Sequence, residues 1–174
     1  MKKDITRIIA ISAILASVLA CGYAFAPQGD YIDKSIKKVY VQSFKNNTAQ
    51  AEIDTYIRAA FIDQFIQGGR FSLADNVEEA DATLQGTITN LTTTALSYRA
   101  STLAAEERAT ITMDITFQER SSGKVIWTSK NAGGTADYVL PDNINAMPQT
   151  RKTALLKLAT DTAEKIYNIM MSGF

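Results

Sequence analysis

Residues 110–118 read TITMDITFQ, so that polar and apolar side chains alternate at every position. Successive side chains of a β-strand point to opposite faces of the sheet, and the alternation therefore predicts a strand with one buried and one wet face. Residues 121–124, SSGK, form a turn sequence, which predicts a hairpin with a second strand at 125–128. Threonine dominates the polar positions, and a wet face of this kind is typical of antiparallel sheets.

Strand patterns also precede this hairpin. Residues 37–44 are rich in β-branched and aromatic side chains, and residues 71–74 form a shorter apolar segment. Small or apolar residues alternate with polar ones at 82–89. The phase is lost near Asn90, which predicts a bulge, and pairing is expected to resume at 95–98.

Two segments are expected to be connections rather than strands. Residues 99–107 are polar, and we expect them to join the strand that ends at 98 to the strand at 110–118. Residues 131–149 contain Gly-Gly, Pro-Asp-Asn and a second Pro, which is the composition of loops and turns. This part of the chain is therefore expected to be rich in loops.

Two segments have helical periodicity. In residues 49–67 the apolar side chains recur three and four positions apart, and Gly68-Gly69 supplies the left-handed conformation that ends many helices. A second apolar stripe runs through residues 150–171. The element order is then β-α-β-β-β-α, which predicts an α+β fold: a two-layer α/β sandwich with two helices packed on one face of a four-stranded mixed sheet.

The N-terminal residues 1–20 have the pattern of a secretory leader. Three cations in the first seven residues precede an uncharged apolar run, which is too short to span a bilayer comfortably. The run ends in VLAC, and its last residue, Cys21, is the only cysteine of the chain. The pattern resembles a bacterial lipobox, in which the leader is cleaved before a cysteine that receives a diacylglycerol. The alternative is an ordinary signal peptide cleaved after Ala24 or Ala26.

Lipidation of Cys21 would divide the chain into three parts. Residues 1–20 would be removed, residues 21–34 would form a short tether, and residues 35–174 would form one compact domain. The residue after the cysteine is Gly22 rather than the Asp that marks inner-membrane retention in such lipoproteins, and this favours the outer membrane.

Composition excludes several classes of function. The 174 residues include 18 Lys+Arg and 18 Asp+Glu, and this balance argues against a nucleic-acid partner. Histidine is absent and cysteine occurs once, which removes the commonest acid/base group, the commonest zinc ligands and any internal disulfide. The carboxylate pairs Glu78-Glu79 and Glu106-Glu107 are neighbours that would point to opposite faces of a strand. We expect neither an enzyme nor a cofactor.

Two basic features remain as candidate binding residues. Arg99 follows the aromatic Tyr98 near the end of a predicted strand, where a guanidinium could hold a phosphate with two hydrogen bonds or could simply be solvated. Arg151 and Lys152 are weaker candidates at the start of the last predicted helix, where the helix dipole disfavours cations. Either these cations serve an anionic partner or the helix begins earlier, near Asp142, and we favour the earlier start.

Several short motifs, taken together, resemble the LptE family of lipopolysaccharide-assembly lipoproteins. They occur in the expected order over nearly all of the chain that follows the leader: Cys21-Gly22-Tyr23-x-Phe25, Phe44-x-Asn46-x-Thr48, Ala80-Asp81-Ala82-x-Leu84-x-Gly86-x-Ile88, Ala95-Leu96-Ser97-Tyr98, Gly123-Lys124-Val125-Ile126-Trp127 and Ala163-Glu164-Lys165-Ile166-Tyr167.

The resemblance implies a function as well as a fold. Proteins of this family sit inside the LptD β-barrel at the outer membrane, plug its lumen, assist its assembly and help to insert lipopolysaccharide into the outer leaflet. They bind lipopolysaccharide through basic residues at a strand tip, and Arg99 next to Tyr98 matches that position. A second basic position of the family falls near Met147, where this sequence has no cation and Arg151 and Lys152 are only nearby.

Two other classes share part of the pattern. Periplasmic lipoproteins that activate peptidoglycan synthases or export curli also resemble a strand, FxNxT, a helix and ADxxxxG. The short tether argues against an activator, which must reach across the periplasm, and the absence of further alternating segments argues against a curli-type pore. A lipid-anchored hydrolase is the third reading, and the lack of histidine argues against it.

Overall fold

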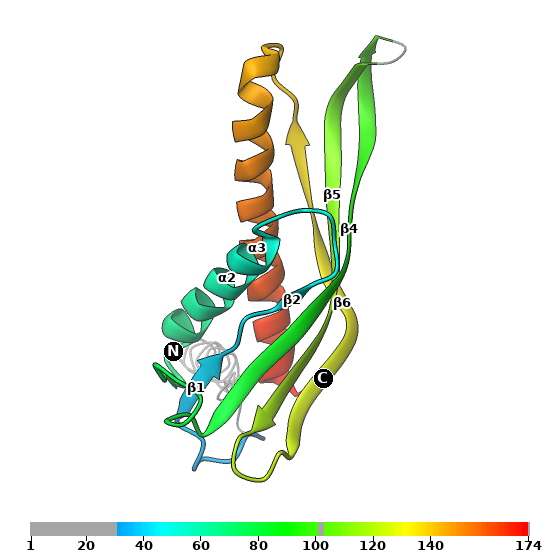
Figure 1. Cartoon of the computed structure of the whole chain (residues 1–174). Helices are drawn as coiled ribbons and strands as arrows, with labels where there is room; N and C mark the ends of the chain where they lie inside the picture. Colours follow the sequence, from blue (N-terminus) through cyan, green and yellow to red (C-terminus); the bar gives the residue numbers. More distant parts are fainter. Residues whose placement is uncertain (1–30, 101–102, 174) are drawn as a thin grey trace, which may run out of the picture.

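The computed structural model describes residues 31–100 and 103–173. Figure 1 shows their arrangement along the chain. The elements are β1 (Lys38–Val41), β2 (Lys45–Asn46), α2 (Ile53–Gly68), β3 (Ser72–Leu73), β4 (Ala82–Ala100), β5 (Leu103–Glu119), β6 (Val125–Val139), the 3₁₀ helix η1 (Ile144–Ala146) and α3 (Met147–Ser172).

One mixed sheet forms the first layer. Its strand order is β3-β1-β4-β5-β6, and β2 also pairs with β4, so that it has six strands rather than the four expected. The pairs β1–β3, β1–β4 and β2–β4 are parallel, whereas β4–β5 and β5–β6 are antiparallel. The count differs because a two-residue strand, β2, follows the predicted strand at 37–44, and because the short segment at 71–74 joins the sheet as β3.

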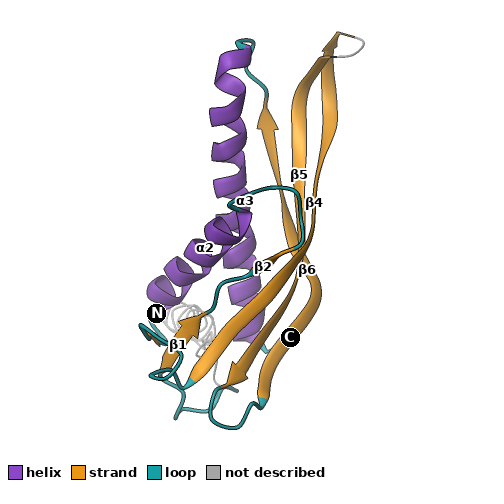
Figure 2. Ribbon diagram, viewed as in Figure 1, coloured by secondary structure: helices purple, strands orange, loops and turns teal. Residues whose placement is uncertain are grey.

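The second layer consists of α2 and α3, and Figure 2 shows both on one side of the sheet. The predicted two-layer α/β sandwich is therefore confirmed. The apolar positions of β5 that alternate in the sequence, from Ile111 to Phe117, are buried beneath the helices. The apolar stripes of both helices face them, with Phe61 and Phe65 of α2 and Leu158 of α3 fully buried.

An aromatic cluster lies where the two helices meet the sheet. The ring of Phe65 lies 5.8 Å from that of Phe71, 6.2 Å from that of Phe117 and 5.3 Å from that of Tyr167, measured between centroids. The four residues come from α2, the residue before β3, β5 and α3. Edge-to-face and tilted aromatic pairs at these separations add to the free energy of area burial. The cluster therefore joins both layers of the sandwich.

Three strands are longer than the sequence patterns predict. Residues 99–107 are not a connection, because β4 continues to Ala100 and β5 begins at Leu103. Residues 131–149 are not mainly loop either, because β6 extends to Val139. Gly133 and Gly134 lie inside β6, and a Cβ on Gly134 would come 2.3 Å from Oγ1 of Thr162 on α3. Gly134 thus permits close packing of α3 on β6. A Cβ on Gly133 would come 2.0 Å from the carbonyl oxygen of Ile111 on β5, so this glycine permits close approach of the two strands instead of forming a turn.

The bulge predicted near Asn90 is confirmed. Ile88 pairs with Met113 and Asn90 pairs with Thr112, so that β4 has one extra residue at this point. The extra residue reverses the phase of the strand, because Leu91 then pairs with the buried Ile111. This explains why the alternation in the sequence breaks there.

Both helices start at residues other than those predicted. α2 begins at Ile53, four residues after the predicted start, because Asn46, Thr48 and Gln50 form a hydrogen-bonded turn before it. α3 begins at Met147 and follows η1. The start before Arg151 agrees with the interpretation we favoured, although it is not as early as Asp142. The cations therefore lie beyond the first helical turn.

Asp81 connects the first residues of two parallel strands, and it provides a test of the fold. Its Oδ2 accepts hydrogen bonds from the backbone N–H groups of Lys38 at 2.8 Å and Lys37 at 2.9 Å, and these bonds hold the pKa of Asp81 below its usual value. We expect Asp81→Asn to lower the free energy of unfolding at pH 7 by about 1 kcal/mol. The loss is modest because the hydrogen bonds are partly exposed and solvent screens the charge.

The same carboxylate gives a pH dependence with a defined sign. Because its pKa is lower in the folded state, its contribution is present above the unfolded pKa of about 4 and is lost as the pH falls through the folded pKa. Urea unfolding at pH 7 and pH 3 measures this. The difference between the wild type and Asp81→Asn should shrink at pH 3, and an equal difference at both pH values contradicts the assignment.

Candidate functional site

The predicted binding residues lie at one end of an elongated domain. Figure 1 shows the tip of the β4–β5 hairpin, the end of β6 and the beginning of α3 at this end. Tyr31, where the described chain starts, lies at the other end beside the last turns of α3, and its hydroxyl donates a hydrogen bond to the carbonyl oxygen of Met170. The tether predicted from the sequence therefore leads into the end opposite the hairpin tip.

The hairpin tip carries the two main candidates. Tyr98 lies on β4 opposite Ala104 of β5, and 60% of its surface is exposed. Arg99 follows it in β4, which agrees with the predicted position near a strand end. The side chain of Arg99 lies outside the described part of the structure. The register of the hairpin shifts on both sides of Tyr98, which twists the strands locally at this tip.

A polar network lies between the sheet and the first half of α3. The hydroxyl of Tyr138 on β6 donates to Oε2 of Glu107 on β5 at 2.5 Å, and Nη2 of Arg151 on α3 lies 3.4 Å from the other carboxylate oxygen. Glu107 is largely buried, with 13% of its side chain exposed. Burial, and then the bond to Glu107, raises the pKa of Tyr138, so this residue remains a hydrogen-bond donor over the physiological pH range.

The network assigns different roles to the weaker candidates. Arg151 contacts Glu107, so that much of its charge is balanced within the protein, although about half of its side chain is exposed. Lys152, the next residue of α3, is exposed. The two cations point in different directions, because they are neighbours on a helix.

A second ion pair near this end was not found from the sequence. Nε and Nη2 of Arg108 on β5 bind both carboxylate oxygens of Asp137 on β6, at 2.6 and 2.7 Å. The two residues are direct cross-strand neighbours. Their pairing depends on the register between two strands, and residue 137 was expected to lie in a loop.

A groove lies beside the network, between the end of β6 and α3. It has a volume of about 330 Å³ and is lined by Asp137, Tyr138, Val139, Gln149, Thr150, Thr153, Ala154 and Lys157. Most of the exposed lining is apolar, and its two charged residues, Asp137 and Lys157, are paired with Arg108 and Asp161. A groove with this composition could hold an alkyl chain.

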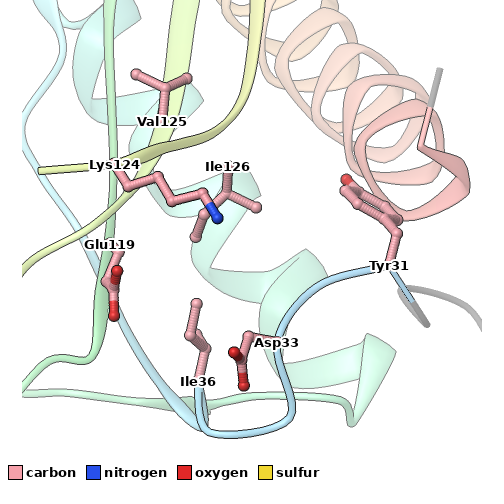
Figure 3. Close-up of a pocket in the computed structure, with 7 residues that line it drawn as sticks. All are labelled: Tyr31, Asp33, Ile36, Glu119, Lys124, Val125 and Ile126. Carbon is pink, nitrogen blue, oxygen red and sulfur yellow. The ribbon is translucent and has the colours of Figure 1, made fainter. Parts of the chain in front are cut away.

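A smaller pocket of about 290 Å³ lies at the opposite end. Figure 3 shows Tyr31, Asp33, Ile36, Glu119, Lys124, Val125 and Ile126 around it. The backbone N–H and the side chain of Ser35 hold the pKa of Asp33 below its usual value. Charges of both signs line the pocket, so it has no clear preference for an anion.

Three further observations bear on the predicted site classes. Cys21 lies outside the described residues. Within residues 31–100 and 103–173, no group of three or more His, Cys, Asp or Glu side chains could hold a metal ion. In the same residues, no helix has both the length and the apolar composition needed to cross a membrane.

A comparison with known families gives a match over most of the chain. The family described as LptE, lipopolysaccharide-assembly, matches residues 36–170. This range includes nearly all of the sandwich, the hairpin tip and the Glu107–Tyr138–Arg151 network. No curated protein matches the sequence.

Solved structures share the fold at low sequence identity. Lipoprotein B from Nitrosomonas europaea has a TM-score of 0.52 and 13% identity, with 87% of this chain and 91% of that chain covered. A protein from Xanthomonas campestris has a TM-score of 0.53 and 12% identity, with 79% and 85% covered. PelC from Paraburkholderia phytofirmans, solved as a dodecamer, has a TM-score of 0.50 and 15% identity, with 83% and 93% covered. These similarities establish the fold alone.

Proposed function

Because the chain belongs to the LptE lipopolysaccharide-assembly family, we propose that it is an outer-membrane lipoprotein that plugs an LptD-type β-barrel and helps to insert lipopolysaccharide into the outer leaflet. The family match over residues 36–170 carries this proposal. The protein acts by binding rather than by catalysis, and acylated Cys21 anchors it to the membrane. The domain lies on the periplasmic side of the membrane, within the barrel lumen.

The shape of the domain supports this arrangement. The tether enters one end, and the candidate lipopolysaccharide-binding residues lie at the other end (Figure 1). α3 has 26 residues and is therefore about 39 Å long, comparable to the thickness of a bilayer. An anchored domain of this length can present its tip far from the anchored end. The threonines on the wet face of the sheet also suit contact with the polar interior of a large barrel.

Lipopolysaccharide contact is assigned to the hairpin tip and the adjacent groove. Arg99 supplies a guanidinium for a lipid A phosphate, and the exposed ring of Tyr98 supplies an amphipathic surface beside it. The apolar lining of the groove along α3 suits an acyl chain. Arg151 is a weaker phosphate contact, because Glu107 already balances its charge. Lys152 is the remaining basic candidate.

Copurification tests the barrel partner. A tagged mature protein, extracted in mild detergent from the outer membranes of its own cells, should repeatedly carry one barrel of about LptD size. A tagged, unrelated outer-membrane lipoprotein from the same cells is the control. Repeated recovery of this protein without such a barrel contradicts the proposal, and recovery with a peptidoglycan synthase or a curli pore favours the activator or curli-export classes instead.

Reversing the charge of Arg99 tests whether the hairpin tip binds lipopolysaccharide. We expect Arg99→Asp to weaken lipopolysaccharide binding about tenfold at low salt, because one charge-assisted hydrogen bond is lost and a repulsive charge is added. The effect should diminish in high salt. Lys34→Asp, at the exposed last residue of the predicted tether, is the matched control and should bind as the wild type does. Equal affinities of Arg99→Asp and the wild type at low salt remove Arg99 from the site.

A further inference from the structure

One carboxylate continues an apolar row of the sheet. Every second side chain of β5 from Ala109 to Phe117 is buried and apolar beneath the helices, and Glu107 is the next residue of this row toward the hairpin tip. Its cross-strand neighbours are Ala95 of β4 and Tyr138 of β6. A carboxylate that has lost most of its water adds little net stability even when it is paired. Packing alone therefore does not account for a carboxylate at position 107.

The two partners of Glu107 bind it unequally. The hydroxyl of Tyr138 donates to Oε2 at 2.5 Å, whereas Nη2 of Arg151 lies 3.4 Å from Oε1, near the limit for a hydrogen bond. A guanidinium can bind a carboxylate with two short parallel bonds, as Arg108 does with Asp137 at 2.6 and 2.7 Å. The contact of Arg151 with Glu107 is thus much looser than that neighbouring pair.

Arg151 also has donors left for a ligand. About half of its side chain is exposed, and a guanidinium carries more N–H groups than one carboxylate oxygen can accept from. The groove between β6 and α3 shares Tyr138 with the network and is lined by Thr150, the residue before Arg151. An anionic group at this end of the groove therefore lies within reach of the guanidinium.

We propose that Glu107 is an internal competitor for the ligand phosphate, that is, a carboxylate of the protein that occupies Arg151 until the phosphate replaces it. In the free protein the guanidinium contacts Glu107. When lipopolysaccharide binds, Arg151 turns outward to the phosphate, and Tyr138 stays hydrogen-bonded to Glu107. The inference rests on the proposed function, because it takes a lipid A phosphate as the ligand.

Such a competitor makes binding selective. A phosphate monoester carries more negative charge than a carboxylate and offers more acceptor oxygens, so it can displace the long contact between Arg151 and Glu107. A lipid without a free anionic group has nothing to offer the guanidinium in exchange. Glu107 therefore lowers the affinity for every ligand but excludes uncharged lipids from Arg151 most strongly.

Removing the charge of Glu107 tests the proposal. Glu107→Gln keeps the shape of the side chain and an oxygen that can accept from Tyr138, and it releases Arg151. We expect the affinity of the mature protein in detergent for lipopolysaccharide at low salt to rise about fivefold. The gain should vanish with lipid A from which the phosphates have been removed. Glu106→Gln, exposed on the opposite face of β5, is the matched control and should bind as the wild type does.

A double variant shows whether the gain acts through Arg151. Arg151→Gln alone should weaken binding less than about twofold, since its charge is already balanced. In the Glu107→Gln background the same substitution should remove the whole gain, and circular dichroism shows that all the variants fold. An unchanged affinity of Glu107→Gln, or a gain that persists without Arg151, overturns the inference.

The wild type gives a readout that does not depend on the folding of Glu107→Gln. The Nε–H resonance of Arg151, assigned by its loss in Arg151→Gln, should shift when lipopolysaccharide is added and should not shift with phosphate-free lipid A. Binding that depends on Arg99 but leaves this resonance in place overturns the inference alone. A wild type that binds no lipopolysaccharide overturns the proposed lipopolysaccharide contact as well.

Discussion

Replacing Phe65 with alanine is expected to lower the free energy of unfolding by about 3–5 kcal/mol. Phe65 is fully buried on α2, and its ring contacts those of Phe71, Phe117 and Tyr167. The substitution leaves a cavity between the helices and the sheet, which the surrounding elements cannot fill without moving. A domain of this size has a total stability of about 5–15 kcal/mol, so a large share would be lost.

The neighbouring residue provides the control for this prediction. Ile66 lies next to Phe65 on the same helix, but 60% of its surface is exposed. Ile66→Ala should change stability by less than about 1 kcal/mol, because little apolar area is removed from the interior. Urea unfolding of both variants, followed by circular dichroism, measures the difference. Equal losses for the two variants would show that the aromatic cluster does not connect the layers.

The elements with one buried face could be predicted from the sequence. The alternation from Thr110 to Gln118 placed Ile111 and Phe117 in the core, and the stripe of residues 49–67 placed Phe65 there. The bulge near Asn90 was also predicted, because the phase of a half-buried strand reverses at an extra residue. In each case the burial of one face leaves a period of two or of about 3.6 residues in the sequence.

The parts of β4, β5 and β6 near the hairpin tip show no such periodicity in the sequence. α2 does not reach this part of the sheet, so both faces of β4 are wet there and no alternation is required (Figure 2). Glu106 and Glu107 were therefore assigned to a connection, although they are paired strand residues. Gly133 and Gly134 suggested a loop, since the tight packing of Thr162 against β6 depends on the tertiary structure.

The candidate site, too, could be predicted from the sequence only in part. The position of Tyr98 and Arg99 at a strand tip followed from the sequence order, whereas the contact of Arg151 with Glu107 did not. That contact joins residues 44 positions apart and requires the register of the sheet and the orientation of α3. Ion pairs of this kind become visible only when the fold is known. They alter the site because a paired cation is less available to an anionic ligand.

Cys21→Ser is expected to abolish the anchoring of the protein. A diacylglycerol on Cys21 contributes about 0.8 kcal/mol per buried methylene, so one chain of about fifteen methylenes amounts to roughly 12 kcal/mol. Two or more chains hold the domain stably on the membrane. Metabolic labelling with an alkyne fatty acid should mark the wild type strongly and the variant not at all, and the variant should leave the membrane fraction.

The outcome also decides between the two interpretations of the leader. If the leader is cleaved before Cys21, the mature wild type begins at this residue and its intact mass exceeds that of the polypeptide by the attached acyl groups. If cleavage occurs after Ala24 or Ala26, Cys21 is lost with the leader, and wild type and variant have the same mature mass and no label. Ser17→Ala, inside the leader, is the matched control and should be labelled as the wild type is. An unlabelled wild type would remove the membrane anchor from the proposed function, because the tip is placed far from the membrane surface only if the opposite end is fixed there.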